Sequence, residues 1–153
     1  MSSFIEPAIA GVMIRPLKHF ADERGTLHHM LRADDPHFQQ FGEIYFSGVR
    51  EGMVKGWRVH RRLTANLAVP IGAIRLVLFD DRADSVTKGR KMVIETGTVN
   101  YALITIPPGV WSAWQGIGPN LSLVANCATE PHDPAETEAA GLSPGVIAHD
   151  WNA

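Results

Sequence analysis

The chain has 153 residues, 45% of them apolar, and a formal net charge of -2 at pH 7. These values are typical of one globular domain that can bury its own core, so we expect residues 1–153 to form a single domain. Without a basic excess, we expect no nucleic-acid partner, and without an apolar run of about 18 residues we expect no membrane partner. Because the N-terminus shows no basic leader, the default expectation is a cytoplasmic protein.

Short apolar runs separated by Gly, Pro, Asp and Asn dominate the middle of the chain. Such closely spaced runs with turn residues between them predict an all-β sandwich or barrel. In chain order, the expected strands cover residues 43–49, 53–59, 66–71, 73–80, 91–95, 101–107 and 120–128. The only cysteine, Cys127, lies in the last run, so an internal disulfide is excluded and a buried apolar role is expected.

Two short helices are expected at the periphery. The first covers residues 33–41, where Asp34 or Asp35 is a suitable cap and Pro36 would occupy the first turn. The second covers residues 135–141, directly after Pro134. No long segment in the middle of the chain has a helical period.

A metal site was considered first, because strands of this kind with a Pro-Pro-Gly turn are typical of metal-binding cupins. Those proteins offer His-x-His, a Glu and a later His. Here the corresponding positions hold Arg58, His60, Ala65 and Ser112. Arginine is permanently charged and a single His cannot hold a transition metal tightly, so we expect neither a metal nor another cofactor.

Arg58 and His60 are the strongest candidates for chemistry. In a strand alternate side chains share a face, so Gly56, Arg58 and His60 are expected on one face, and Lys55, Trp57 and Val59 on the other. If the first face lines a pocket, a guanidinium beside a titratable His would suit an anionic substrate. The alternative is that this face meets solvent.

Two tryptophans follow the Pro-Pro-Gly turn. Trp111 and Trp114 flank Ser112. They either pack in the core or form a stacking wall for a sugar or a base.

Five motifs in the same order resemble those of the dTDP-4-dehydrorhamnose 3,5-epimerase family. FADERG at 20–25 is similar to F-x-D-x-R-G, and KGWR at 55–58 falls on R-G-L-H. DDRADSVTKG at 80–89 matches D-x-R-x-x-S-x-T-x-G, and IPPG at 106–109 matches I-P-P-G. TEPHDP at 129–134 resembles S-x-P-Y-x-P, and the resemblance runs from about residue 12 to the C-terminus.

The resemblance implies an antiparallel cupin-type jelly roll that binds a nucleotide-diphosphate sugar without metal. In this family a His oriented by an Asp removes the proton alpha to the ketone of a 4-keto-6-deoxy sugar. A Tyr supplies the replacement proton from the other face, and a Lys stabilises the enolate. The family forms homodimers by lending N-terminal strands, and an apolar segment such as 4–14 needs to be covered, so we expect a homodimer.

The catalytic positions depart from the family pattern. Arg58 stands at the base position and His132 at the acid position, while the enolate Lys falls at Ala65 and the orienting Asp near Ser143. We therefore expect His60 or His132 to move the proton and Arg58 to stabilise the enolate.

The positions that bind substrate match the family better. The resemblance assigns Arg24 to the diphosphate, Phe20 to stacking and Lys55 to the role of a family Arg. It also places Glu43 where the family has a Gln and His29 where it has a Glu. The expected substrate-binding residues are Phe20, Arg24, His29, Glu43, Lys55, Asn66, Trp111 and Trp114.

Three functions remain open from the sequence. The first is an epimerase or isomerase of a nucleotide-linked 4-keto-6-deoxy sugar with an altered acid/base set. The second is a non-catalytic nucleotide-sugar binding protein of the same fold. The third is an unrelated metal-dependent cupin enzyme.

Overall fold

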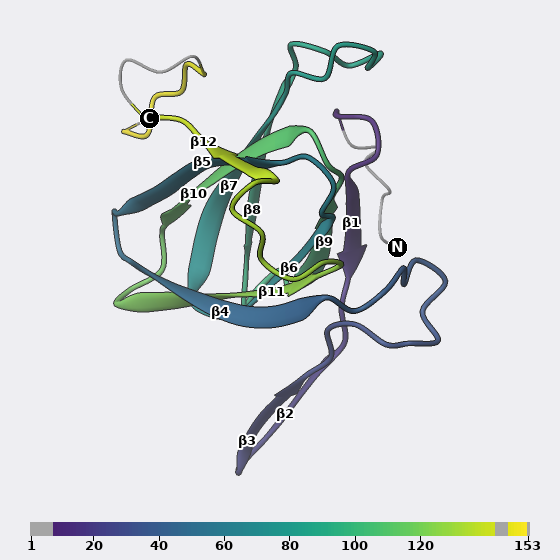
Figure 1. The fold of residues 1–153 in the computed structure, drawn as a ribbon. Coiled ribbons are helices and arrows are strands. Elements are labelled where there is room, and N and C mark those ends of the chain that lie inside the picture. The colour runs from purple at the N-terminus through teal and green to yellow at the C-terminus, as the bar shows by residue number, and fades with distance from the viewer. Residues whose placement is uncertain (1–7, 143–146, 153) are drawn as a thin grey trace.

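The structure, a computed structural model, describes residues 8–142 and 147–152. Figure 1 shows a chain built from strands. They are β1 (Met13–Pro16), β2 (His19–Asp22), β3 (Gly25–His28), β4 (Glu43–Arg50), β5 (Val54–His60), β6 (Ala65–Ile71), β7 (Ala73–Asp80), β8 (Lys91–Gly97), β9 (Ala102–Ile106), β10 (Val110–Gly116), β11 (Leu121–Ala128) and β12 (Thr137–Ala139).

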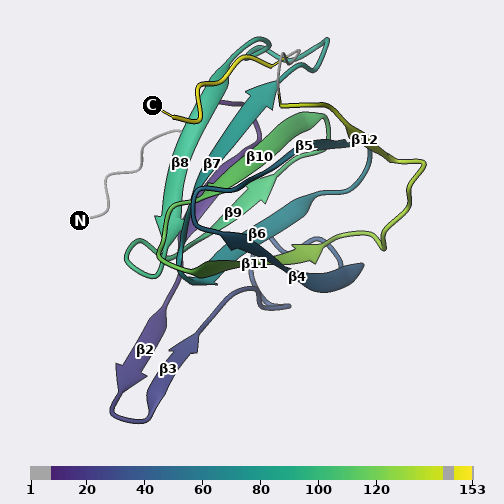
Figure 2. The same cartoon turned by 90° about the vertical axis from the view of Figure 1, so that its left-hand side faces the viewer.

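The strands form two five-stranded sheets that face each other, and a separate two-stranded hairpin (Figures 1 and 2). The first sheet has the order β1-β9-β6-β11-β4, and the second has the order β12-β5-β10-β7-β8. The strands pair antiparallel, and most neighbours in a sheet are distant in the sequence. This arrangement confirms the expected antiparallel jelly-roll sandwich.

The main core lies between the two sheets because inward-facing positions of both are apolar. Along β7, Ile74, Leu76 and Leu78 are fully buried in this core. Val77 points to the other face of the same sheet, where a second cluster forms around Trp57. Period-two alternation therefore supplies both faces of the second sheet with apolar side chains.

Neither expected helix is present in the described part of the chain. Residues 34–37 form tight turns, in which the Phe38 N–H donates to the Asp35 carbonyl and Arg15 pairs with the Asp35 carboxylate. Residues 137–139 become strand β12, which pairs with β5. Pairing along an open sheet edge outweighs the weak local helix preference of this segment. No helix of the described chain is long and apolar enough to cross a membrane.

A polar cluster holds the loop that joins β7 to β8. Asp80 is completely buried and accepts hydrogen bonds from Arg82, Ser85 and Thr87. Arg82 also donates to the Ala10 carbonyl, at 2.6 Å. The motif at 80–89 therefore has a structural role, because it ties this loop to the segment before β1.

The segment before β1 packs within its own chain. Ile9 and Val12 are buried in the main core. Residues 4–7 lie outside the described residues. The apolar character of segment 4–14 therefore does not by itself call for a partner, and the expected homodimer needs other support.

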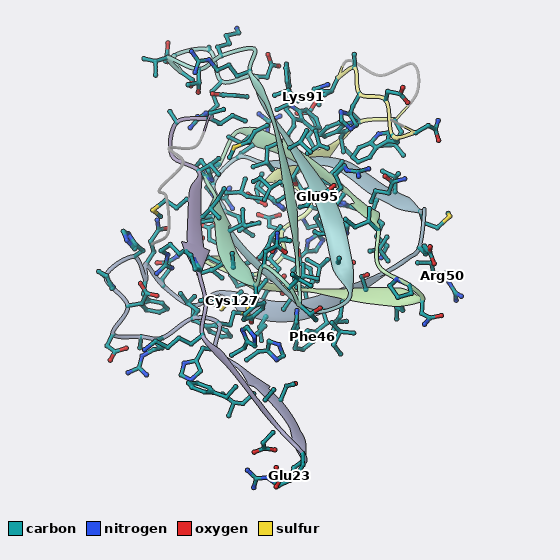
Figure 3. The ribbon with its side chains drawn as sticks, turned by 180° about the vertical axis from the view of Figure 1, so that it is seen from behind. Glu23, Phe46, Arg50, Lys91, Glu95 and Cys127 are labelled. Atoms are coloured by element: carbon teal, nitrogen blue, oxygen red, sulfur yellow. The ribbon has the colours of Figure 1, made fainter. Side chains whose placement is uncertain are left out.

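The hairpin β2–β3 extends away from the sandwich, and Glu23 marks its tip (Figure 3). The outer face of the first sheet, on the side of this hairpin, carries exposed apolar side chains. They are Ile44 and Phe46 of β4, with Phe20 and Leu27 of the hairpin, exposed by 50%, 62%, 58% and 57%. Cys127 of β11 lies beside Ile44 and is buried, as expected from its apolar run.

Candidate functional site

A cavity of about 630 Å³ opens between the two sheets. Its walls come from β4 and β6 on one sheet and from β5 and β10 on the other, and β12 and the loop that carries His132 border it. Its apolar floor includes Leu63, Leu67 and Val110. The cavity is large enough for a small ligand, and its floor is apolar.

Strand β5 supplies three polar side chains to the cavity, among them its two cations. Arg58 and His60 both line it, which agrees with their predicted common face. Lys55 lines it too, although simple alternation placed it on the opposite face. The cause is an irregularity in the pairing with β10, where Ser112 is opposite Arg58 but the next residue, Ala113, is opposite Gly56.

His60 forms a close pair with a buried carboxylate. Its ring Nδ1 lies 2.7 Å from Oε1 of Glu136, whose side chain is completely buried. The other oxygen, Oε2, accepts the backbone N–H groups of Arg62 and Leu63, both at 3.1 Å. A carboxylate can only accept, so Nδ1 carries the hydrogen, and in the neutral imidazole the lone pair lies on Nε2. Within the described chain no hydrogen bond engages Nε2.

Glu136 stays ionised in its buried position. Burial opposes its charge, but the hydrogen bonds from the Arg62 N–H, from His60, from the Leu63 N–H and from Thr137 outweigh burial and lower its pKa to about 2. The site therefore holds a fixed negative charge behind His60. The sequence offered no direct signal for this residue, because Glu136 lay in a segment interpreted as a helix.

Two cations of the cavity have no carboxylate partner among the described residues. Arg58 and Lys55 form no ion pair there, although Lys55 Nζ donates to Ser47 Oγ, at 3.0 Å. The neighbouring Arg61 and Arg62 do form ion pairs, with Glu138 and with Glu130 and Asp133. The positive charge at the cavity is thus left for a ligand.

Tyr45 is a cavity residue that sequence reasoning missed. It lies on β4, in the sheet opposite His60, and its hydroxyl accepts a hydrogen bond from Asn126 Nδ2, at 2.9 Å. Alternation along β4 contained the signal, because Glu43, Tyr45 and Ser47 share a face.

The remaining predicted residues divide between the cavity and other places. His132 and Trp114 line the cavity. Asn66 does not, because its side chain is buried in bonds to the Cys127 carbonyl and to Thr105. Trp111 packs in the outer cluster with Trp57, which favours the core interpretation for this tryptophan. Ser143 lies outside the described residues.

The residues assigned to substrate by the N-terminal motif are not at the cavity of their own chain. Phe20 and Arg24 lie on the projecting hairpin, where the Arg24 side chain is 84% exposed and pairs with Asp22. The His29 ring packs against Phe20, with 5.9 Å between ring centroids. Glu43 begins β4 and is not among the lining residues.

No group of three His, Cys, Asp or Glu side chains that could hold a metal ion occurs within residues 8–142 and 147–152. The cavity does hold an imidazole oriented by a carboxylate, two cations without a carboxylate partner in the described chain, and a phenol. These groups are suited to proton transfer on a carbon acid whose developing negative charge needs stabilisation.

The chain is similar over nearly its full length to known sugar epimerases and isomerases. No family model matches it. It is 33% identical to the probable low-salt glycan biosynthesis epimerase Agl13 of Haloferax volcanii, over 96% of this chain and 97% of that protein. It is 41% identical to the dTDP sugar isomerase of Desulfovibrio desulfuricans, with a TM-score of 0.92 over 96% of this chain and 94% of the other.

The same fold occurs in dTDP-4-dehydrorhamnose 3,5-epimerase of Sulfolobus tokodaii, with 24% identity and a TM-score of 0.78 over 88% of this chain and 79% of that chain. The motifs, the jelly roll and the full-length match to an epimerase agree. The chain belongs to the dTDP-4-dehydrorhamnose 3,5-epimerase family of nucleotide-sugar epimerases and isomerases.

Proposed function

We propose that this protein is an epimerase or isomerase that moves the proton alpha to the ketone of a nucleotide-linked 4-keto-6-deoxy sugar. The observation that carries the proposal is the pair of His60 and buried Glu136 at the cavity wall. An imidazole whose Nδ1–H is held by a carboxylate presents a basic Nε2 to a ligand.

The charges of the cavity support the same reaction. Removing a proton alpha to a ketone places negative charge on the ketone oxygen, and the enolate needs a fixed cation or donor nearby. Arg58 and Lys55 line the cavity without a carboxylate partner in the described chain. They also suit the diphosphate of a nucleotide sugar, because both side chains are cationic hydrogen-bond donors.

A dTDP-linked sugar is the first ligand to test, because the relative from Desulfovibrio desulfuricans is named a dTDP sugar isomerase. Arg24 and Phe20 are proposed to contact this ligand from a second copy of the chain. They lie on the projecting hairpin, outside the cavity of their own chain (Figure 2).

The test is solvent exchange at the carbons beside the ketone. The protein is incubated with dTDP-4-keto-6-deoxyglucose in deuterated water, and deuterium at C3 and C5 is followed by NMR. Wild-type protein should incorporate deuterium, and His60→Asn should slow incorporation at least about 100-fold, since a general base contributes 10²- to 10⁴-fold. His37→Asn is a matched control, because His37 is not a cavity residue.

The same experiment separates the alternatives. Binding of the nucleotide sugar without exchange in the wild-type protein would support a binding protein instead of an enzyme. Exchange that survives His60→Asn at full rate would remove His60 as the base and leave His132 to be tested by His132→Phe.

A further inference from the structure

Tyr45 lies on the cavity wall that belongs to the other sheet from His60. His60 is on β5 of the second sheet, and Tyr45 is on β4 of the first. Both side chains line the cavity. A flat sugar ring held between the two walls would therefore present one face toward the imidazole and the other toward the phenol.

The hydrogen bonds behind Tyr45 determine which way its hydroxyl points. Asn126 Oδ1 accepts the backbone N–H of Asn66, at 3.1 Å, and a backbone N–H can only donate. If the amide of Asn126 were flipped, its NH₂ group would face the Asn66 N–H, and two donors cannot hydrogen-bond each other. Nδ2 must therefore face Tyr45. That NH₂ group donates to the Tyr45 hydroxyl, at 2.9 Å.

The support behind Asn126 is itself fixed. Asn66 is 7% exposed and Asn126 is 3% exposed. Asn66 Nδ2 donates to the Cys127 carbonyl, at 3.0 Å, and its Oδ1 accepts from Thr105, at 2.8 Å. This buried network explains why the Asn66 side chain does not line the cavity, and it holds Asn126 as a donor.

The Tyr45 hydroxyl accepts its hydrogen bond from Asn126, so its own hydrogen remains free to be donated. Within the described chain no protein group accepts that hydrogen. We propose that Tyr45 is the proton donor on the face of the sugar opposite His60, which makes the reaction an inversion of a carbon centre. This inference rests on the proposed function and assigns its acid to a residue outside the S-x-P-Y-like motif.

The step is redox-neutral. His60 Nε2 takes the proton from the carbon alpha to the ketone, and the electron pair of that C–H bond moves to the ketone oxygen to give the enolate. Tyr45 then gives its hydroxyl proton to the same carbon from the opposite face, and the ketone re-forms as the new C–H bond is made. The phenolate and the imidazolium return to their starting states by exchanging one proton through water.

The test is Tyr45→Phe in deuterated water, with two rates measured by NMR: deuterium entering unchanged substrate and formation of the inverted sugar. Inversion should fall at least about 100-fold. Exchange into substrate of unchanged configuration should persist, because His60 still removes the proton and returns deuterium to the same face. Tyr101→Phe is the matched control, since the only other tyrosine bonds the His29 carbonyl away from the cavity and both rates should stay within about twofold.

His132→Phe tests the other possible donor, because His132 also lines the cavity. If His132→Phe abolishes inversion while Tyr45→Phe retains it, the assignment to Tyr45 is wrong. An equal loss of exchange and inversion in Tyr45→Phe also overturns it, because the phenol would then act before the enolate forms. A wild-type protein without exchange defeats the proposed function itself, whereas normal exchange and inversion in Tyr45→Phe defeat only the Tyr45 assignment.

Discussion

Glu136 sets the tautomer of His60 because its two carboxylate oxygens have different hydrogen-bond partners. Oε2 accepts two backbone N–H groups, and Oε1 faces His60 Nδ1. An amide at this position would keep its oxygen toward the two backbone donors and turn its NH₂ toward His60. The imidazole would then accept at Nδ1 and carry its hydrogen on Nε2, where it could no longer remove a proton.

Glu136→Gln should therefore lower kcat by about 10³-fold or more while KM changes little, as expected when an orienting carboxylate is replaced by an amide. Glu138→Gln is the matched control, because that carboxylate is exposed and pairs with Arg61 at the surface. Steady-state kinetics of both variants provide the measurement. A Glu136→Gln variant with wild-type kcat would show that the tautomer of His60 does not control the reaction.

At the scale of elements, the loop between β7 and β8 depends on one buried charge. Asp80 holds Arg82, Ser85 and Thr87, and Arg82 and Thr87 hold the backbone of Ala10. Burial opposes ionisation of Asp80, but the bonds from Arg82, Ser85 and Thr87 keep its pKa well below the ordinary value. The cluster links the second sheet to the segment that enters β1.

Asp80→Ala should destabilise the fold by about 3 kcal/mol or more, because it leaves a partly buried guanidinium and two hydroxyls without their acceptor. Asp84→Ala, on the same loop but exposed, should change the free energy of unfolding by no more than about 0.5 kcal/mol. Denaturation with urea measures both. If the two variants were equally stable, the motif at 80–89 would not have the structural role assigned to it.

At the scale of the whole molecule, exposed apolar side chains gather on the outer face of the first sheet. Figure 3 shows Phe46 on the side from which the hairpin extends, and Ile44 is two residues away on the same strand. Phe46 also borders the cavity. Exposed apolar side chains with a projecting hairpin beside them favour association with a second copy. The homodimer is therefore proposed on this surface and no longer on the segment before β1.

Ile44, unlike Phe46, does not line the cavity. Ile44→Glu should convert a dimer to a monomer at micromolar concentration, because it places a charge in the proposed interface. It should also weaken binding of the nucleotide sugar if Arg24 reaches the cavity from the partner. Val99→Glu is the control, since Val99 is 95% exposed on a turn. Analytical ultracentrifugation gives the mass, and a wild-type monomer would contradict the proposal.

The sequence by itself determined seven strands, β4 to β9 and β11, and the common orientation of Arg58 and His60, but it missed β10 between them. The expected runs at 43–49 and 73–80 coincide with β4 and β7. These features are local, because apolar alternation with a period of two defines both a strand and the face of each side chain. The five motifs also indicate the family, because their residues and order are properties of the sequence alone.

Only the tertiary structure decided which groups meet in the cavity. Glu136 is 76 residues from His60, and their contact arises because segment 137–139 pairs with the edge of β5. Lys55 enters the cavity through an irregularity in strand pairing, and Tyr45 acquires its orientation from Asn126, 81 residues away. A periodic pattern shows which side of a strand a residue occupies. It does not show which residue will contact that side chain from another strand, because the contact depends on pairing between distant segments.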